Sequence, residues 1–232
     1  MQERNVSGAK VAGFSLLELM IAMAVTLVIM LLASSLVAGS FNIRNRENQR
    51  TDALADSQRA LNLMTREIAN AGYGLNDNGI VPTDSTTTTI RVRANLNAAA
   101  GETTSSTATD RDEDIKYLLY TDSSNSYIVR LDVNTAAQEM VLANRVDALT
   151  IRYYGDKVYY TTATNACDIS NVRDAAGNAV SEVTPGNAKY VVISICVTLP
   201  AVGAFGAPGY QPASRVQLVS DATLRNADLV NY

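Results

Sequence analysis

The chain has 232 residues, of which 47% are hydrophobic and 18% charged, a composition typical of a folded protein rather than a disordered one. Its formal net charge of -4 disfavours nucleic acid as a principal partner, because general nucleic-acid binding needs a basic surface. Histidine is absent, so the commonest general base and the commonest zinc ligand are missing, which disfavours most hydrolase and zinc mechanisms.

An apolar segment begins near the N-terminus. Residues 19–40 carry no charge, and 22 residues in a helix are enough to cross a bilayer core of about 30 Å. One acid, Glu18, stands at the start of this segment, where a carboxylate in hydrocarbon costs roughly 2.5 to 3.5 kcal/mol. Such an acid predicts a functional role and a partner. Cleavage after Gly13 would supply one, because the new amine of Phe14 would lie four residues before Glu18 or on a neighbouring copy.

The stretch from Gly13 to Glu18 reads GFSLLE and resembles the prepilin peptidase site of type IV pilins and type II secretion pseudopilins. The resemblance implies cleavage after Gly13, N-methylation of Phe14, and recognition of an adjacent subunit's amine by Glu18. It also implies a cytoplasmic leader and an external C-terminal domain. Two alternatives stay open at this point: a secretory signal cleaved near residues 37–39, and a plain single-span anchor in which Glu18 has no role.

The helical pattern continues beyond the apolar segment. Glycines 72 and 74 predict where it ends, so we expect one helix over about residues 14–71. Residues 66–74, REIANAGYG, resemble the end of the long helix in PilW-type minor pilins. Apolar residues three, four or seven positions apart mark one face of the second half of this helix: Leu54, Leu61, Met64, Ile68 and Ala71.

The rest of the chain predicts strands and loops. Residues 82–110 are rich in Thr, Ser, Ala and Asn, which predicts a mobile loop or variable insertion with one short strand at 90–93. Residues 224–226, Leu-Arg-Asn, resemble the end of the last strand of the PilW family. Apolar and aromatic residues predict strands at 115–121, 127–133, 149–154, 158–162, 190–199 and 215–224.

The strand at 190–199 should place residues 191, 193, 195, 197 and 199 in the core and Cys196 on its other face. Cys167 and Cys196 are too far apart for a CxxC redox or zinc motif. In an exported domain they predict a disulfide, which would contribute up to roughly 3 to 4 kcal/mol in the chain-entropy model. The alternative is two unpaired buried thiols.

Other possible sites are weaker. Asp110, Asp112 and Asp114 form a D-x-D-x-D pattern of the kind that binds calcium, but the glycine and the glutamate of an EF-hand loop are missing, so a solvated turn is favoured. Residues 76–79, NDNG, predict a turn. Residues 200–212 predict a hairpin loop, with an exposed contact surface for a neighbour as the alternative.

We find no motif for an activated serine or for a phosphate loop, and we expect neither an enzyme nor a bound cofactor or metal. We expect an α+β, pilin-like fold in which a long N-terminal helix packs on an antiparallel sheet. Its parts would be a leader at 1–13, a membrane-spanning and filament-core half-helix at 14–41, an amphipathic half-helix at 42–74, and an external β-rich domain at 75–232.

The resemblance implies a minor pilin that primes assembly or caps the tip of a type IV pilus. It would sit in the inner membrane and then in a filament at the cell surface. Its partners would be other pilin and minor pilin subunits, the prepilin peptidase, the inner-membrane assembly platform and membrane lipid. The alternatives are a J-type pseudopilin of a type II secretion system, and a membrane-tethered adhesive or ligand-binding protein that does not polymerise.

Overall fold

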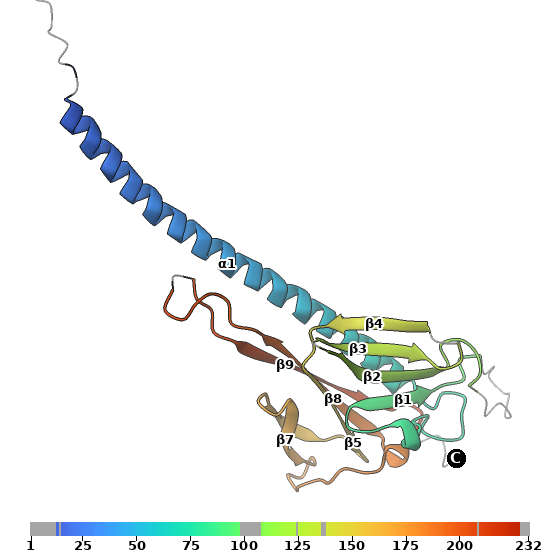
Figure 1. The fold of residues 1–232 in the computed structure, drawn as a ribbon. Coiled ribbons are helices and arrows are strands. Elements are labelled where there is room, and N and C mark those ends of the chain that lie inside the picture. The colour runs from blue at the N-terminus through green and yellow to red at the C-terminus, as the bar shows by residue number, and fades with distance from the viewer. Residues whose placement is uncertain are drawn as a thin grey trace, which may run out of the picture. The chain divides into compact units, whose positions relative to one another are not determined.

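The computed structural model describes Gly13 and residues 15–97, 108–123, 125–135, 138–207 and 209–227. Its backbone forms two compact units: Met1–Asn45 with Val202–Gln211, and Arg46–Ala201 with Pro212–Tyr232. One helix, α1 (Leu16–Ala69), contributes to both units (Figure 1). Its ends lie two residues inside the predicted limits on either side.

In the first unit, the side chains of α1 are exposed over residues 16–45 except at Gly39. Three hydroxyl groups of this stretch, those of Thr26, Ser34 and Ser35, hydrogen bond to the backbone of the helix itself. The hydroxyl of Thr26 donates to Ala22 O at 2.8 Å, and that of Ser34 donates to Met30 O at 2.7 Å. These bonds leave the helix surface apolar, because the hydroxyls need no outside partner.

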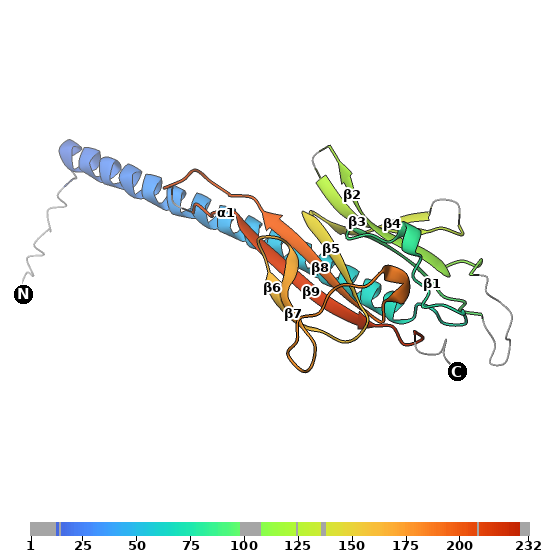
Figure 2. The ribbon, with the colours of Figure 1, turned by 90° about the horizontal axis from the view of Figure 1, so that it is seen from below.

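The second unit consists of the C-terminal part of α1 and antiparallel strands (Figure 2). A four-stranded sheet has the order β1 (Thr89–Arg93), β2 (Asp114–Asp122), β3 (Asn125–Asp132), β4 (Gln138–Asn144). A three-stranded sheet has the order β5 (Ala148–Tyr154), β8 (Tyr190–Leu199), β9 (Ser214–Thr223), and β6 (Tyr159–Ala163) pairs with β7 (Asp168–Arg173). Two short 3-10 helices, η1 (Pro82–Asp84) and η2 (Pro185–Asn187), complete it.

One hydrophobic core joins α1 to both larger sheets. Leu61, Met64 and Ile68 of the helix are buried with Tyr117 of β2 and Ile193 of β8. Full burial of one such aliphatic side chain stabilises the fold by about 1.5 to 3 kcal/mol. The helix period predicted from the sequence therefore selects the buried face correctly from Leu61 to Ala71, whereas the predicted Leu54 is only partly buried. The α+β class is confirmed, since the structure has one long N-terminal helix and antiparallel sheets.

The predicted strands are confirmed to within two residues at each end. The strand β8 differs from expectation in one respect, because its second face is buried too. Val192 on that face packs in a cluster with Tyr154 and Val158, against which the β6–β7 hairpin places Ile169 and Val172. The β6–β7 hairpin covers this second face, so both faces of β8 are buried.

The short strand predicted at 90–93 is confirmed as β1, but the rest of residues 82–97 is not the mobile loop predicted for 82–110. This stretch forms η1 and β1, and Ile90 and Val92 of β1 are only 0% and 4% exposed. The strand pairs with β2, where Ile90 lies opposite Tyr117. Alternation thus outweighs the polar composition, because two apolar side chains are enough to hold this strand in the core. Residues 98–107 lie outside the described part of the chain.

Candidate functional site

The N-terminal segment places Glu18 in the first turn of α1. An acid there is favoured by the helix dipole, whose positive end is the N-terminus. Glu18 is exposed, and among the described residues no cationic side chain forms an ion pair with it. Gly13 is described and has open space where a side chain would stand, whereas Phe14 lies outside the described residues. The roles of Gly13, Phe14 and Glu18 in cleavage, methylation and assembly stay predictions.

After Glu18 the helix surface carries no charge until Arg44. Large apolar side chains are exposed throughout this stretch, Leu31 at 72% and Leu36 at 70% among them. Among the described residues, α1 is the one helix that is long and apolar enough to cross a membrane. So much exposed apolar surface is costly in water, so lipid or neighbouring apolar helices must cover it.

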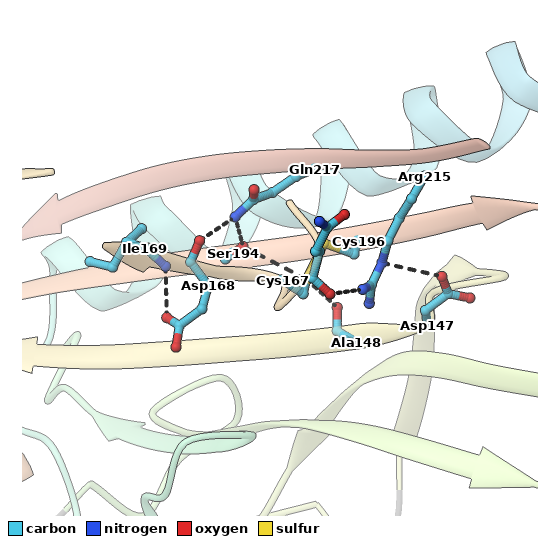
Figure 3. The surroundings of a disulfide bond; sticks show 10 residues. Asp147, Ala148, Cys167, Asp168, Ile169, Ser194, Cys196, Arg215 and Gln217 are labelled. Atoms are coloured by element: carbon cyan, nitrogen blue, oxygen red, sulfur yellow. Dashed lines mark hydrogen bonds and ion pairs between the residues drawn. A yellow bond between two sulfur atoms is a disulfide. The ribbon is translucent and has the colours of Figure 1, made fainter. Parts of the chain in front are cut away.

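The structure joins Cys167 and Cys196 in a disulfide with a Cα–Cα distance of 5.7 Å, the pairing expected from the sequence (Figure 3). Both cysteines are fully buried. Cys167 has a φ of 55°, a left-handed conformation that residues other than glycine seldom adopt. The bond links the turn before β7 to the centre of β8.

Two side chains of β9 support the disulfide from the same side (Figure 3). The amide nitrogen of Gln217 donates to the carbonyl of Asp168 at 2.7 Å and to the hydroxyl of Ser194 at 2.8 Å. Arg215 donates to the carbonyl of Asn165. The segment that carries Cys167 is therefore held to both neighbouring strands, β8 and β9.

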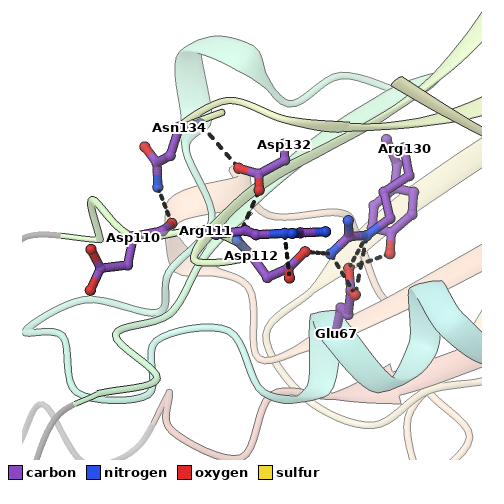
Figure 4. A network of polar contacts seen from close by, with 8 residues as sticks. Glu67, Asp110, Arg111, Asp112, Arg130, Asp132 and Asn134 are labelled. Carbon is purple, nitrogen blue, oxygen red and sulfur yellow. Dashed lines mark hydrogen bonds and ion pairs between the residues drawn. The ribbon is translucent and has the colours of Figure 1, made fainter. Parts of the chain in front are cut away.

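A partly buried polar cluster lies between α1 and the four-stranded sheet (Figure 4). Nη2 of Arg130 on β3 lies 3.0 Å from Oε1 of Glu67 on α1 and 2.8 Å from Oδ1 of Asp112. The hydroxyl of Tyr117 donates to the same glutamate. Burial raises the pKa of the Tyr117 hydroxyl, and the charge of Glu67 raises it further, so Tyr117 is the proton donor of the pair. This cluster fixes the helix against the sheet.

The three aspartates of the D-x-D-x-D pattern are engaged separately. Asp114 forms a bidentate ion pair with Arg91, in which Nε and Nη2 of the arginine each lie 2.7 Å from a carboxylate oxygen. Asp112 pairs with Arg130 as described above. Asp110 accepts a hydrogen bond from Asn97 at 2.7 Å. Within the described residues no cluster of His, Cys, Asp or Glu could hold a metal ion. The aspartates instead form the turn and ion pairs before β2.

The two segments that resemble PilW-type minor pilins contact one another. The N–H of Arg225 donates to the carbonyl of Ala69 at 3.1 Å. The side-chain amide of Asn226 donates to the carbonyls of Asn70 at 3.3 Å and Ala71 at 3.2 Å. These carbonyls lie at the last residue of α1 and just after it, where the helix supplies no further N–H partner. The Leu-Arg-Asn segment therefore caps the C-terminus of α1.

The sequence predicted the pairing of Cys167 with Cys196 but did not predict the pair of Glu67 and Arg130. Arg130 occupies an apolar position in a strand that the sequence did predict, and it is only 9% exposed. A buried arginine requires an acidic partner, and Glu67 lies one position before Ile68 of the core face, where its side chain is partly buried. The available signal in the sequence was therefore a cationic residue at a core-facing strand position, which indicates an acidic partner nearby.

Comparison with known proteins bears on the N-terminal end. Residues 8–34 match the family model described as the prokaryotic N-terminal methylation motif. This match confirms the interpretation of the segment as that of a type IV pilin-like prepilin, and it does not test the PilW type. No curated protein sequence matches the chain.

A solved structure of a type IV-like pilin from Thermus thermophilus aligns with 75% of this chain and 97% of its own, at 11% identity and a TM-score of 0.39. A similarity this low supports no conclusion about fold or function.

Proposed function

We propose that the chain is a PilW-type minor pilin, made as a prepilin and assembled into a type IV pilus, where it primes assembly or caps the tip. The observation that carries the proposal is the methylation motif at 8–34, followed by a helix in which Glu18 is the single charged residue before Arg44. A motif of this kind together with a helical anchor suggests a structural subunit rather than an enzyme. The resemblance of residues 66–74 and 224–226 to PilW-type minor pilins is the support for this type, and these two segments contact one another.

The proposed mechanism starts in the inner membrane. Cleavage after Gly13 by the prepilin peptidase, followed by methylation, would give a mature chain that begins at Phe14. The apolar half of α1 would hold it in lipid, with residues 75–232 outside. On assembly the helix would leave lipid for a bundle of helices from other subunits. Glu18 would then neutralise the Phe14 amine of a neighbour, which offsets the cost of moving a carboxylate into an apolar interior.

The processing step is tested by mass spectrometry of the mature N-terminus, purified from native membranes. A chain that begins at N-methylated Phe14 is expected. A start near Ser40 would mean a secretory signal, and an intact Met1 would mean a plain anchor.

The assembly step is tested with Glu18→Ala. The variant should be cleaved like the wild type but lost from sheared filaments by at least about tenfold, because only assembly needs the counter-ion. Glu47→Ala is the matched control, since Glu47 lies on the same helix beyond the apolar stretch and forms only a weak exposed pair with Arg50 at 3.9 Å. Normal incorporation of the Glu18 variant would refute the pairing.

Two alternatives remain distinguishable by experiment. A J-type pseudopilin would purify with secretion components, and its deletion would stop protein export while pili remain. A tethered adhesive protein that does not polymerise would give only monomers on crosslinking in cells that make pili.

A further inference from the structure

The loop Val202–Gln211 belongs to the same compact unit as the apolar half of α1. Its ends pair as a bridge, with the N–H of Val202 donating to Gln211 O at 3.0 Å and the reverse bond at 2.9 Å. Residues 200–214 contain no charged side chain. The loop is thus a closed, uncharged structure, built on glycines with positive φ.

The loop approaches the backbone of α1 closely at a pair of glycines. A Cβ atom added to Gly209 would lie 2.8 Å from the Cα of Gly39 and 3.0 Å from its carbonyl oxygen. Gly39 is the one buried residue of the helix over 16–45. The two glycines therefore allow a close approach that no side chain would permit, and they seat the loop at the level of residue 39.

That level coincides with the end of the apolar segment. Residues 19–40 span about 33 Å as a helix, close to the thickness of a bilayer core of about 30 Å. If this segment crosses the membrane, as the proposed function requires, Gly39 lies at the boundary between hydrocarbon and headgroups. The loop then lies at the same boundary.

The large exposed side chain of the loop, that of Phe205, is of a kind suited to the boundary between hydrocarbon and headgroups. Phe205 is 91% exposed, and its ring lies 5.4 Å from that of Tyr210 in an edge-to-face arrangement. Aromatic rings with an apolar body and, in tyrosine, a polar end gather where a membrane meets water. A protein interface usually has a polar rim, whereas residues 200–214 carry no charge and lie in the same compact unit as the apolar segment, so we infer lipid as the partner.

We propose that the loop docks into the interfacial layer of the bilayer, with Phe205 inserted below the headgroups and Tyr210 among them. The loop would act as a second membrane contact beside α1 and would orient the subunit on the membrane before it is assembled. This inference rests on the proposed function, because it needs residues 19–40 to lie in lipid.

The chain contains no tryptophan, so one introduced indole reports its own surroundings. The full chain carrying Phe205→Trp is reconstituted in phosphatidylethanolamine–phosphatidylglycerol vesicles with bromine near the headgroup end or near the middle of the acyl chains. We expect blue-shifted emission, protection from iodide, and stronger quenching by the shallow bromines. Leu27→Trp, in the middle of the apolar segment, should be quenched most by the deep bromines.

The outcomes separate the two proposals. Suppose that bromine quenches the Leu27→Trp variant, while the Phe205→Trp variant emits at the wavelength of an indole in water and is quenched by iodide. The docking inference is then overturned, and the membrane anchor formed by residues 19–40 stands. If position 205 is shielded from iodide but not quenched by bromine, the loop contacts protein and the inference is also overturned. If neither position is quenched, the membrane anchor fails and the proposed function with it.

Discussion

Gly79 lies where the end of α1 meets β1. Its φ is +75°, and its carbonyl accepts a hydrogen bond from the N–H of Arg93 at 2.7 Å. The N–H of Gly72 in turn donates to Arg93 O at 2.9 Å. A Cβ at position 79 would lie 2.0 Å from the nitrogen of Gly72 and 2.4 Å from Arg93 O. The predicted NDNG turn is therefore also a point of close backbone packing.

Gly79→Ala should destabilise the fold by at least about 3 kcal/mol, because the new methyl group meets backbone atoms and the left-handed conformation is strained as well. Gly177→Ala is the matched control. Its φ is +87° but no atom lies within 4 Å of the added Cβ, so it should lose only about 1 to 2 kcal/mol. Urea unfolding of both variants measures the difference, and equal losses would refute the packing argument.

At the scale of elements, the β6–β7 hairpin depends on attachment to the sheet beneath it. Two strands alone are marginally stable in water. The Cys167–Cys196 bond closes a sequence separation of 29 residues, and Gln217 adds two hydrogen bonds beside it. The disulfide therefore holds in place the β6–β7 hairpin, which covers the second face of β8.

Replacing both Cys167 and Cys196 by serine should cost about 2 to 4 kcal/mol of stability without affecting N-terminal processing. The wild type should show a lower urea midpoint in reductant, whereas the double variant should give the same midpoint with and without it. If reductant leaves the wild-type midpoint unchanged, the disulfide contributes nothing to this fold.

The elements found from the sequence are those whose signal is local. The apolar period of α1 and the apolar run of β8 each lie within one segment, and the structure has both elements, although β8 is buried on its second face as well. The strands β4 and β7 were missed, because β4 exposes Met140 and Val141 and β7 is only half-buried. Their strand structure comes from pairing with neighbours rather than from their own pattern.

The same distinction applies to the sites. Glu18 lies within the methylation motif at residues 8–34, so the local sequence predicts the two together. Glu67 and Arg130 are 63 residues apart in the chain, and no local pattern relates them. Only the packing of α1 on the four-stranded sheet brings this pair together.

For the whole molecule, the acid limit of stability should come from carboxylates that the fold keeps ionised. Burial alone would raise the pKa of Asp132, but hydrogen bonds from the N–H groups of Asp112 and Asn134 outweigh it and hold that pKa below 3.8. Burial likewise opposes ionisation of Asp168, and the Arg152 side chain and the Ile169 N–H outweigh it.

Because both pKa values are lowered on folding, the stabilisation is complete above the unfolded pKa and is lost as pH falls through the folded values. With no histidine in the chain, we expect urea midpoints to be flat between about pH 5 and 8 and to fall below about pH 4. Asp132→Asn should lose roughly 1 to 3 kcal/mol at pH 7 and show a shallower decline in acid, because its charge-assisted hydrogen bonds are weakened. A midpoint that changes steeply near pH 6 would show that some other group controls stability.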